Sequence, residues 1–266
     1  MSAAIASCYS TPLTIVSWNI AEAAPSFAAP SRSRRAQEAP RLIRECILGR
    51  NQSPPDIIAL QESPFPSFGT ELLEEQVYVS VGGTALSHCG YVDLLLKRQL
   101  AEKLSLDSNL SSVACRIVLP NKTTLSVSSS HLAPFKHGAG TRLRQCQHLR
   151  ESLLQESGSN MILLGDYNMR ASEDTSIENI LGVDAWKAAG SNQRNKFTWD
   201  SFANRYHEDG FSFRARFDRC YVGGSENIEV NRFGLIGNKP VVGGGSAKDF
   251  LSDHYGMIIG LDIDKS

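Results

Sequence analysis

Polar and ionisable residues stand where several hydrophobic runs of this sequence end or begin. These positions are Asn19, Glu62, His131, Asp166, Asn168, Asp253 and His254. A carboxylate or an imidazole is costly to bury unless it is paired or bound to a metal ion. An ordinary strand end explains any one of them. Several such ends on separate strands, however, predict a shared cleft at one edge of a sheet.

The expected cleft is rich in hard oxygen ligands. Glu62, Asp166 and Asp253 supply carboxylates, and no cysteine pair has metal-ligand spacing. Such ligands suit Mg²⁺, with Mn²⁺ as a substitute, rather than Zn²⁺. Carboxylates that hold Mg²⁺ beside a substrate phosphate indicate phosphoester hydrolysis, in which one carboxylate orients the attacking water. His254 could donate to a phosphoryl oxygen if Asp218, in the segment RFDR, fixes its ring.

Hydrophobic runs bounded by Pro, Gly, Asn or Ser predict the elements that position these side chains. Strands are expected at 13–20, 56–62, 91–100, 113–120, 123–132, 161–168, 215–222 and 254–263. Apolar spacing predicts helices at 141–155, 41–48 and 176–188, with a weaker pattern at 70–76. Two loops, 21–40 and 239–250, are candidate walls of an active site.

The order of these elements predicts an α/β protein. The turn-like PNK after residue 119 indicates a hairpin, so a purely parallel sheet is not expected. Two mixed sheets packed together, with helices outside, fit the pattern. No repeat or long linker divides the chain, which predicts a single domain over residues 1–266.

Composition excludes several other classes of protein. Hydrophobic residues make up 41% of the chain and charged residues 21%, which is typical of a globular protein. No apolar run reaches the ~20 residues of a membrane span, and the N-terminus lacks a secretory signal pattern. Six scattered cysteines predict reduced thiols in an intracellular protein, in the nucleus or the cytoplasm. The net charge of −1 argues against coating long nucleic acid by bulk electrostatics.

Six short motifs occur in an order that resembles a known superfamily. They are WN (18–19), LQE (60–62), SHL (130–132), GDYN (165–168), RFDR (216–219) and SDH (252–254). Each is weak alone, but together they cover nearly the whole chain. They resemble the endonuclease/exonuclease/phosphatase (DNase I-like) superfamily. The resemblance implies a four-layer α/β sandwich, with two mixed β-sheets face to face, helices outside and the site at one rim.

Further segments resemble the tyrosyl-DNA phosphodiesterase 2 group within that superfamily. They are GDYNMR, DAWKAAG (184–190), FTWDS (197–201) and FGLIG (233–237). The resemblance implies an Mg²⁺-dependent phosphodiesterase that hydrolyses 5′-phosphotyrosyl bonds in the repair of topoisomerase adducts. The implied partners are DNA 5′ ends that carry tyrosine or a peptide, with RNA ends left open as a second substrate. A monomer without membrane contact is expected.

The resemblance also implies a role for each candidate residue. Glu62 would be the principal Mg²⁺ ligand with Asp253 as an outer contributor, and Asp166 with Asn168 would position or deprotonate the water. Phosphate would be held by Asn19, His131 and His254, with Asp218 orienting His254. The substrate contacts would be Arg170, Trp199 and Phe197. On residue type alone, Trp199 beside Phe197 is more often a core residue, and Arg170 could simply pair with Glu173 or Asp174.

The chain departs from the family pattern in its first motif. Ala21 stands where most members have an aspartate, and Glu22 follows it. Adjacent strand residues point to opposite faces, so Glu22 is not expected to replace the missing carboxylate. Metal binding should then rest on Glu62. The chain also starts close to its first predicted strand, so no separate N-terminal ubiquitin-binding domain is expected. Two alternatives stay open, namely an abasic-site or general nuclease, and a DNA-end-binding module that has lost catalysis.

Overall fold

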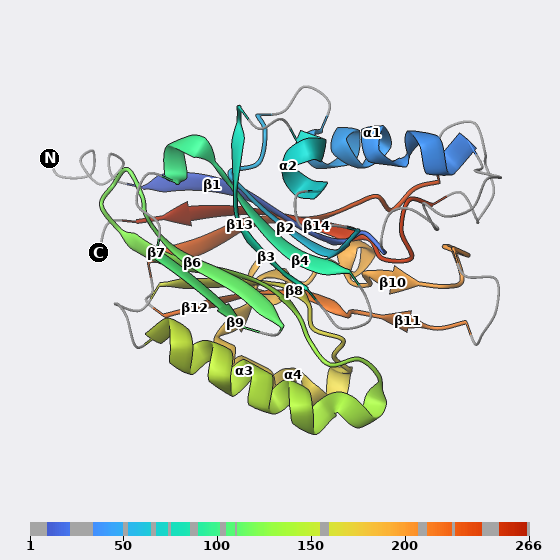
Figure 1. Cartoon of the computed structure of the whole chain (residues 1–266). Helices are drawn as coiled ribbons and strands as arrows, with labels where there is room; N and C mark the ends of the chain where they lie inside the picture. Colours follow the sequence, from blue (N-terminus) through green and yellow to red (C-terminus); the bar gives the residue numbers. More distant parts are fainter. Residues whose placement is uncertain are drawn as a thin grey trace, which may run out of the picture.

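Two six-stranded β-sheets lie face to face between two layers of helices (Figure 1). The computed structural model describes residues 10–21, 34–49, 53–64, 68–73, 76–85, 90–101, 105–109, 111–154, 160–206, 212–224, 227–240 and 250–264. The first sheet has the strand order β13-β14-β1-β2-β4-β3, and the second has the order β5-β6-β7-β8-β12-β9. This arrangement confirms the predicted four-layer α/β sandwich.

The strands come from the whole length of the chain. The first sheet contains β1 (Thr11–Asn19), β2 (Ile57–Ser63), β3 (Tyr78–Ala85), β4 (Tyr91–Lys97), β13 (Ile228–Ile236) and β14 (Gly256–Ile263). The second contains β5 (Ser105–Asn109), β6 (Ser112–Val118), β7 (Thr124–His131), β8 (Met161–Asp166), β9 (Val183–Asp184) and β12 (Asp218–Gly223). A separate ribbon pairs β10 (Trp199–Asp200) with β11 (Arg214–Ala215).

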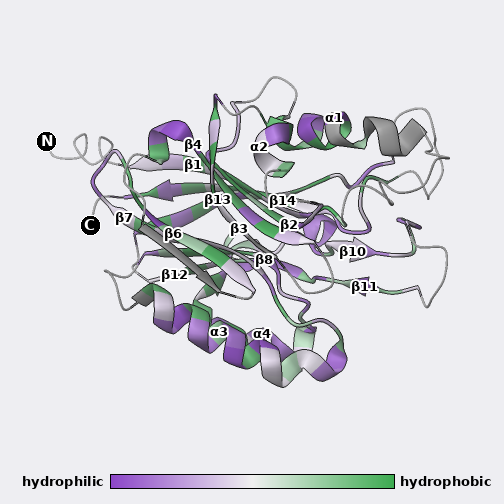
Figure 2. Cartoon of the chain, in the orientation of Figure 1, coloured by the Kyte–Doolittle hydropathy of each residue, from purple (hydrophilic) through white to green (hydrophobic). Residues whose placement is uncertain are grey.

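Helices cover the outer face of each sheet (Figure 1). The first sheet packs against α1 (Arg34–Leu48) and α2 (Phe68–Leu73), where Ile43 and Ile47 bury against Trp18. The second packs against α3 (Ala139–Leu154) and α4 (Asp174–Leu181), and a short α5 (Ala185–Ala188) follows β9. Figure 2 shows hydrophilic and hydrophobic residues alternating along α3, as expected for a helix with one buried face. The main core lies between the sheets and is built from aliphatic side chains of both.

Each sheet has one parallel pair at its centre. In the first sheet β1 runs parallel to β2, and in the second β7 runs parallel to β8. Each parallel pair is joined by a crossover that contains a helix, α1 in one case and α3 in the other. The other neighbouring strands are antiparallel. The predicted PNK hairpin is confirmed as the β6–β7 connection.

Some element boundaries differ from the predicted ones. The strand expected at 91–100 ends at Lys97, and Arg98–Leu100 forms a 3₁₀ turn. The single helix expected at 176–188 is divided at Gly182, whose φ is +111°. A Cβ at Gly182 would lie 2.3 Å from the carbonyl oxygen of Val222, so the chain turns there in close contact with β12. β3, β5 and β13 were not predicted, because they lack a continuous apolar run.

The expectations on membrane spans and cysteines can be compared with the structure, whereas those on two loops largely cannot. No helix among the described residues is long and apolar enough to cross a membrane. Four of the cysteines fall in described segments, and they are free thiols. The loop expected at 239–250 lies largely outside the described residues. The loop expected at 21–40 does too, except that residues 34–40 belong to α1.

Candidate active site

The predicted polar residues converge because of how the strands are directed. β1, β7 and β8 end with Asn19, His131 and Asp166, and Glu62 is the penultimate residue of β2. β12 and β14 are antiparallel to β8 and β1, so their first residues lie at the same rim where those strands end. Asp218 begins β12, and His254 comes just before β14. One rim of the sandwich therefore collects side chains from both sheets.

Asn19 lies at the centre of this rim and bridges the two sheets. Its side-chain nitrogen donates to Glu62 Oε1 and to Asp166 Oδ2, each at 3.0 Å. Its side-chain oxygen accepts the backbone N–H of Ala21 at 2.9 Å, which sets the orientation of the amide. Ala21 thus takes part through its backbone, in a turn with φ of +48°. Glu22, the other residue in question, lies outside the described residues.

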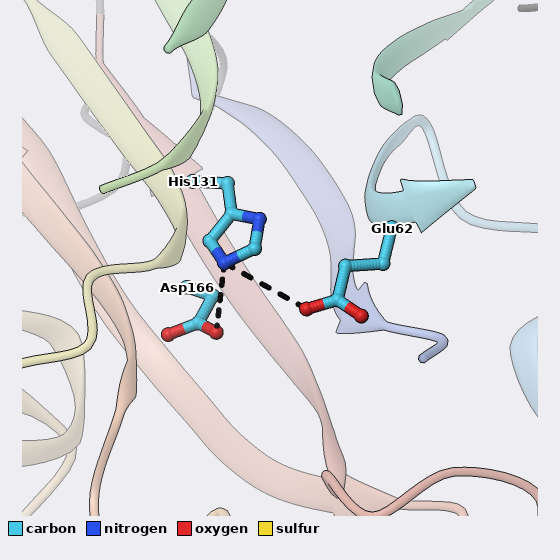
Figure 3. A group of neighbouring side chains, drawn as sticks. All are labelled: Glu62, His131 and Asp166. Carbon is cyan, nitrogen blue, oxygen red and sulfur yellow. Dashed lines mark ion pairs between the residues drawn. The ribbon is translucent and has the colours of Figure 1, made fainter. Parts of the chain in front are cut away.

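His131 faces both carboxylates from the end of β7. Its Nε2 lies 3.8 Å from Glu62 Oε1 and 3.5 Å from Asp166 Oδ2 (Figure 3). The ligand atoms of these three residues lie within 4.8 Å of one another, a spacing that could hold a metal ion. Burial raises the pKa of Glu62, although His131 and the Asn19 hydrogen bond oppose that rise.

A backbone distortion places Glu62 at this position. The β2–β4 pairing slips between Leu60 and Ser63, which leaves one extra residue on β2. Glu62 itself has φ of +56°, in the left-handed region that L-residues seldom adopt. Gly90 packs against this bulge, and a Cβ at Gly90 would lie 2.6 Å from Ser63 O. Strain of this kind concentrates at functional sites and persists only where surrounding contacts hold it.

The GDYN segment shapes the opposite wall. Gly165 lies so close to β7 that a Cβ would meet Ser130 O at 1.9 Å, so only glycine fits. Asn168 has φ of +51° and donates its backbone N–H to Asp166 Oδ1 at 2.8 Å. The side-chain nitrogen of Asn168 donates to Leu132 O at 3.1 Å. These contacts fix Asp166 so that its Oδ2 is directed toward Asn19 and His131.

His254 and Asp218 form a buried pair. His254 Nδ1 lies 2.8 Å from Asp218 Oδ2, and its Nε2 lies 3.8 Å from Asp166 Oδ2. Burial alone would lower the pKa of His254. The Asp218, Asp166 and Asp253 carboxylates outweigh that effect and raise the pKa well above its ordinary value. The carboxylates around His254 thus favour its protonated imidazole, and its Nε2 is directed into the site.

Three hydrogen bonds fix the backbone around His254. Its carbonyl accepts from Trp18 Nε1 at 3.1 Å, and its N–H donates to Ser252 Oγ at 3.1 Å. Ser252 Oγ also donates to Asn19 O at 2.8 Å, which ties the SDH segment to the end of β1. Among the described residues, two groups have ligand atoms close enough to share a metal ion, namely Glu62, His131 and Asp166, and Asp166, Asp218 and His254. Asp253 precedes His254 in sequence but belongs to neither group. Its role as an outer contributor stays a prediction.

Buried ion pairs stabilise β12 and the segment that leads into it. Arg216 binds Asp184 through two hydrogen bonds, of 2.8 and 2.6 Å, and Arg219 donates to Asp174 at 2.9 Å. Both arginines are at most 8% exposed. They flank Phe217 and Asp218 in sequence, so the basic residues of RFDR stabilise the strand that carries Asp218.

An aromatic group borders the site beside His254. The Trp199 ring meets His254 edge to face at 5.0 Å and stacks on Phe213 at 5.8 Å. Phe217 packs against Trp199, and the Arg170 guanidinium lies 4.5 Å from the Phe217 ring centre. The Arg170 side chain donates to Asn168 O rather than pairing with Glu173 or Asp174.

Two aromatic residues differ from the sequence-based expectation in their contacts. Phe197 has cationic neighbours, Lys196 at 5.3 Å and Arg214 at 6.0 Å from its ring, and no ring contact with Trp199 among the described residues. Phe213, which is 41% exposed, was not among the predicted residues. Its sequence, FSFRARF over 211–217, is rich in phenylalanine, but no local pattern shows which ring stacks on Trp199, a residue far from it in the sequence.

Residues 16–254 match the model of the endonuclease/exonuclease/phosphatase family. This match covers most of the chain, and it agrees with the two-sheet fold and the polar rim. The chain belongs to the endonuclease/exonuclease/phosphatase family.

Within that family, the chain is similar to tyrosyl-DNA phosphodiesterases. It is 36% identical over 110 residues to the 5′-tyrosyl-DNA phosphodiesterase of Caenorhabditis elegans, covering 41% of this chain and 28% of that protein. It is 26% identical over 223 residues to tyrosyl-DNA phosphodiesterase 2 of Xenopus laevis, covering 79% of this chain and 58% of that protein. The chain thus spans less than two thirds of these relatives.

Solved structures show the same fold. A Danio rerio tyrosyl-DNA phosphodiesterase 2 bound to a single-strand DNA product matches with a TM-score of 0.72 at 19% identity, covering 94% of this chain and 99% of that one. The catalytic domain of human Nocturnin matches with a TM-score of 0.66 at 16% identity, covering 95% of this chain and 94% of that one. At these identities the likeness shows the fold alone.

Proposed function

We propose that this chain is an Mg²⁺-dependent phosphodiesterase that hydrolyses the 5′-phosphotyrosyl bond between a protein tyrosine and a DNA end. RNA ends are the second substrate to test. The observation that carries the proposal is the Asn19 amide, which joins Glu62 and Asp166 opposite the His254–Asp218 pair. Similarity to the worm and frog tyrosyl-DNA phosphodiesterases supports the 5′-phosphotyrosyl bond as the bond that is hydrolysed.

The donor set suits a hard divalent cation. Glu62 and Asp166 bring two carboxylates to one place, with the side chain of Glu62 23% exposed and that of Asp166 2% exposed. Burial, and to a smaller degree the charge of Asp166, raises the pKa of Glu62, and a bound cation would favour the ionised carboxylate. Glu62 would be the main ligand and Asp253 an outer contributor, while Asp166 and His131 face the water and the phosphate. A bound Mg²⁺ supplies charge neutralisation at the phosphate.

The protein side chains have separate tasks in this proposal. Asp166, fixed by the Asn168 backbone, accepts the proton of the attacking water. Asn19 and His131 hold the non-bridging phosphate oxygens. His254, kept protonated by Asp218, donates from Nε2 to the oxygen where negative charge develops. Asp166 and His254 are already oriented by the contacts described above, whereas Asn19 must release one of its two carboxylate hydrogen bonds to reach a phosphate oxygen.

In this proposal the nucleic-acid strand of the substrate binds along the aromatic border formed by Trp199 and Phe213. Trp199 and Phe213 present stacked rings next to His254, and Phe213 is exposed. Nucleobases stack on such rings with little sequence preference. Arg170, close to Asn168, would contact a phosphate oxygen. Phe197 would take part only through the cationic side chains around it.

Two assays test this function. The protein is incubated with Mg²⁺ and a 5′-tyrosyl oligonucleotide and, separately, with a duplex that contains an abasic site. We expect release of tyrosine from the first substrate, no cleavage of the second, and loss of activity with a chelator. Glu62→Ala and Asp166→Ala should abolish turnover, while Glu229→Ala, on the exposed edge strand β13, should not.

The alternatives give different results in the same experiment. Cleavage of the abasic duplex alone would assign the chain to the nucleases of the family and overturn the proposal. Binding without turnover of tyrosyl, abasic or 3′-blocked ends would identify a DNA-end-binding module. Activity that survives both carboxylate substitutions would place the catalytic centre elsewhere.

A further inference from the structure

The turn after β7 holds a strained, exposed phenylalanine. Phe135 is 63% exposed and has φ of +63° and ψ of +163°. That backbone region is occupied almost only by glycine, because a Cβ there meets neighbouring backbone atoms. A large apolar side chain in such a position costs stability twice, through strain and through contact with water. Neither the proposed catalytic residues nor the aromatic border explains it.

A buried arginine holds this turn in its shape. Arg142 of α3 is fully buried, and its Nη1 donates to the carbonyl oxygens of both Ala133 and Phe135 at 2.7 Å. Its Nε and Nη2 donate to the two carboxylate oxygens of Glu173 at 2.9 and 2.7 Å. Gly138 makes room for the guanidinium, since a Cβ there would lie 2.9 Å from Nη1. Two charge-assisted hydrogen bonds thus hold the turn, and two more anchor the guanidinium to Glu173.

The turn presents aromatic and cationic groups together. The Phe135 and His137 rings stack with centroids 5.7 Å apart and an angle of 24° between their planes. Lys136, between them in sequence, is exposed. A flat aromatic surface beside a positive charge matches a nucleobase with its phosphate.

The turn also lies close to the reaction centre. Phe135 follows His131 by four residues, so their Cα atoms are at most about 14 Å apart even if that segment were fully extended. Glu173 links it to the opposite wall as well, because Oε1 accepts the backbone N–H of Arg170 at 3.0 Å. The exposed ring is therefore within reach of the first nucleotides of a bound strand.

We propose that the Phe135–His137 turn is a second stacking platform, which binds a nucleobase of the strand whose 5′ phosphate enters the site. The inference rests on the proposed function, because it takes a nucleic-acid 5′ end as the ligand. It adds a contact on the His131 side of the site, apart from the Trp199 border. The strain at Phe135 is the cost of directing that ring outward.

The test uses Phe135→Gly, which removes the ring and relieves the backbone strain. Glycine accepts the observed φ, so the melting temperature should stay equal or rise. Affinity for a 5′-phosphorylated eight-nucleotide strand, measured by fluorescence anisotropy, should fall about five-fold to a hundred-fold, the usual worth of one stacked base. Phe135→Trp should keep that affinity. Val183→Ala, a change at another exposed apolar residue, on β9, should leave it unaltered.

Kinetics separate this platform from the catalytic centre. For a 5′-tyrosyl oligonucleotide, Phe135→Gly should raise KM by a similar factor and leave kcat unchanged. A small chromogenic aryl phosphodiester without a nucleobase should show no change in either constant.

Failure of this inference and failure of the proposed function give different results. If Phe135→Gly binds and cleaves the oligonucleotide like the parent protein, the platform is overturned and the function stands. If the parent protein cleaves no tyrosyl substrate but its affinity for the phosphorylated strand depends on Phe135, the platform stands without that function. Dependence on Phe135 for a tyrosyl peptide, and not for the strand, would overturn the nucleobase as the occupant.

Discussion

The two sheets have the same plan but bring different properties to the shared rim. Each has a central parallel pair joined through a helix, and each places polar side chains where that pair ends. The first sheet offers Glu62 on a strained bulge, with 23% of its side chain exposed. The second offers Asp166 and Asp218, whose side chains are 2% and 1% exposed and held by hydrogen bonds. The first sheet's side of the rim is thus suited to take a ligand from solvent, and the second sheet's side is suited to keep charged groups oriented.

The largest expected effect comes from the two central carboxylates. Glu62→Gln and Asp166→Asn should each lower kcat/KM about a thousand-fold or more, the worth of several kcal/mol of transition-state stabilisation. They should differ in calorimetric titration with Mg²⁺ or Mn²⁺, because only Glu62 is assigned as the main ligand. Binding should be lost in Glu62→Gln and weakened in Asp166→Asn. An equal loss in both would contradict the division between the sheets.

The ion pairs of the two sheets should differ in their contribution to stability. Arg216→Leu removes the two-bond partner of the buried Asp184 carboxylate and leaves only Arg219 Nε, 3.5 Å from Oδ2, so it should cost about 3 kcal/mol in the free energy of unfolding. Lys97→Leu breaks a pair with Asp56 in which both side chains are 18% exposed, and it should cost about 1 kcal/mol or less. Urea unfolding measures both. Recovery of stability in Arg216→Leu combined with Asp184→Leu would confirm that the poorly compensated Asp184 charge causes the loss.

Asp218→Asn tests the oriented carboxylates of the second sheet directly. The carboxylates raise the pKa of His254, so removing one should lower that pKa and deprotonate the imidazole at a lower pH. The basic limb of the kcat/KM profile should move to lower pH, with a loss of about a hundred-fold at pH 8. A profile that keeps its basic limb would show that His254 is not the donor. Asp200→Asn, in a pair at the exposed Arg214, serves as the control.

The smallest effect concerns a carboxylate that the first sheet buries beneath α2. Burial raises the pKa of Asp93 from 3.8 to about 7, against the opposing influence of Ser63 and the Gly69 backbone. The folded protein then binds a proton that the unfolded chain releases, so stability is greatest below pH 4 and is lost up to about pH 7. Asp93→Asn removes this dependence. Its stability relative to the parent should rise by about 1 kcal/mol between pH 5 and pH 6, measured by urea unfolding.

That stability difference has a simple check. Below pH 4 and above pH 8 the difference between parent and Asp93→Asn should no longer change with pH. A constant difference across the whole range would mean that Asp93 titrates normally.

The positions of the strands were largely predictable because their signal is local. Apolar runs that end in a polar residue indicated β1, β2, β7 and β8 and placed Asn19, Glu62, His131 and Asp166 at their ends. The helix expected at 176–188 was wrong because Gly182 turns against β12, a contact that no local pattern records. The edge strand β13 was missed because exposed polar residues such as Asn231 break its apolar run.

By itself, the sequence determined the kinds of groups available, their order, and their placement at strand ends, since residue type and periodicity are properties of neighbouring residues. Tertiary structure alone decided which of them meet. Asn19 reaches Asp166 across 147 residues of sequence, and Arg142 holds the strained Phe135 turn while Phe213 completes the Trp199 border. Burial, backbone strain and pKa depend on distances between residues that are remote in the chain, and only the folded protein sets those distances.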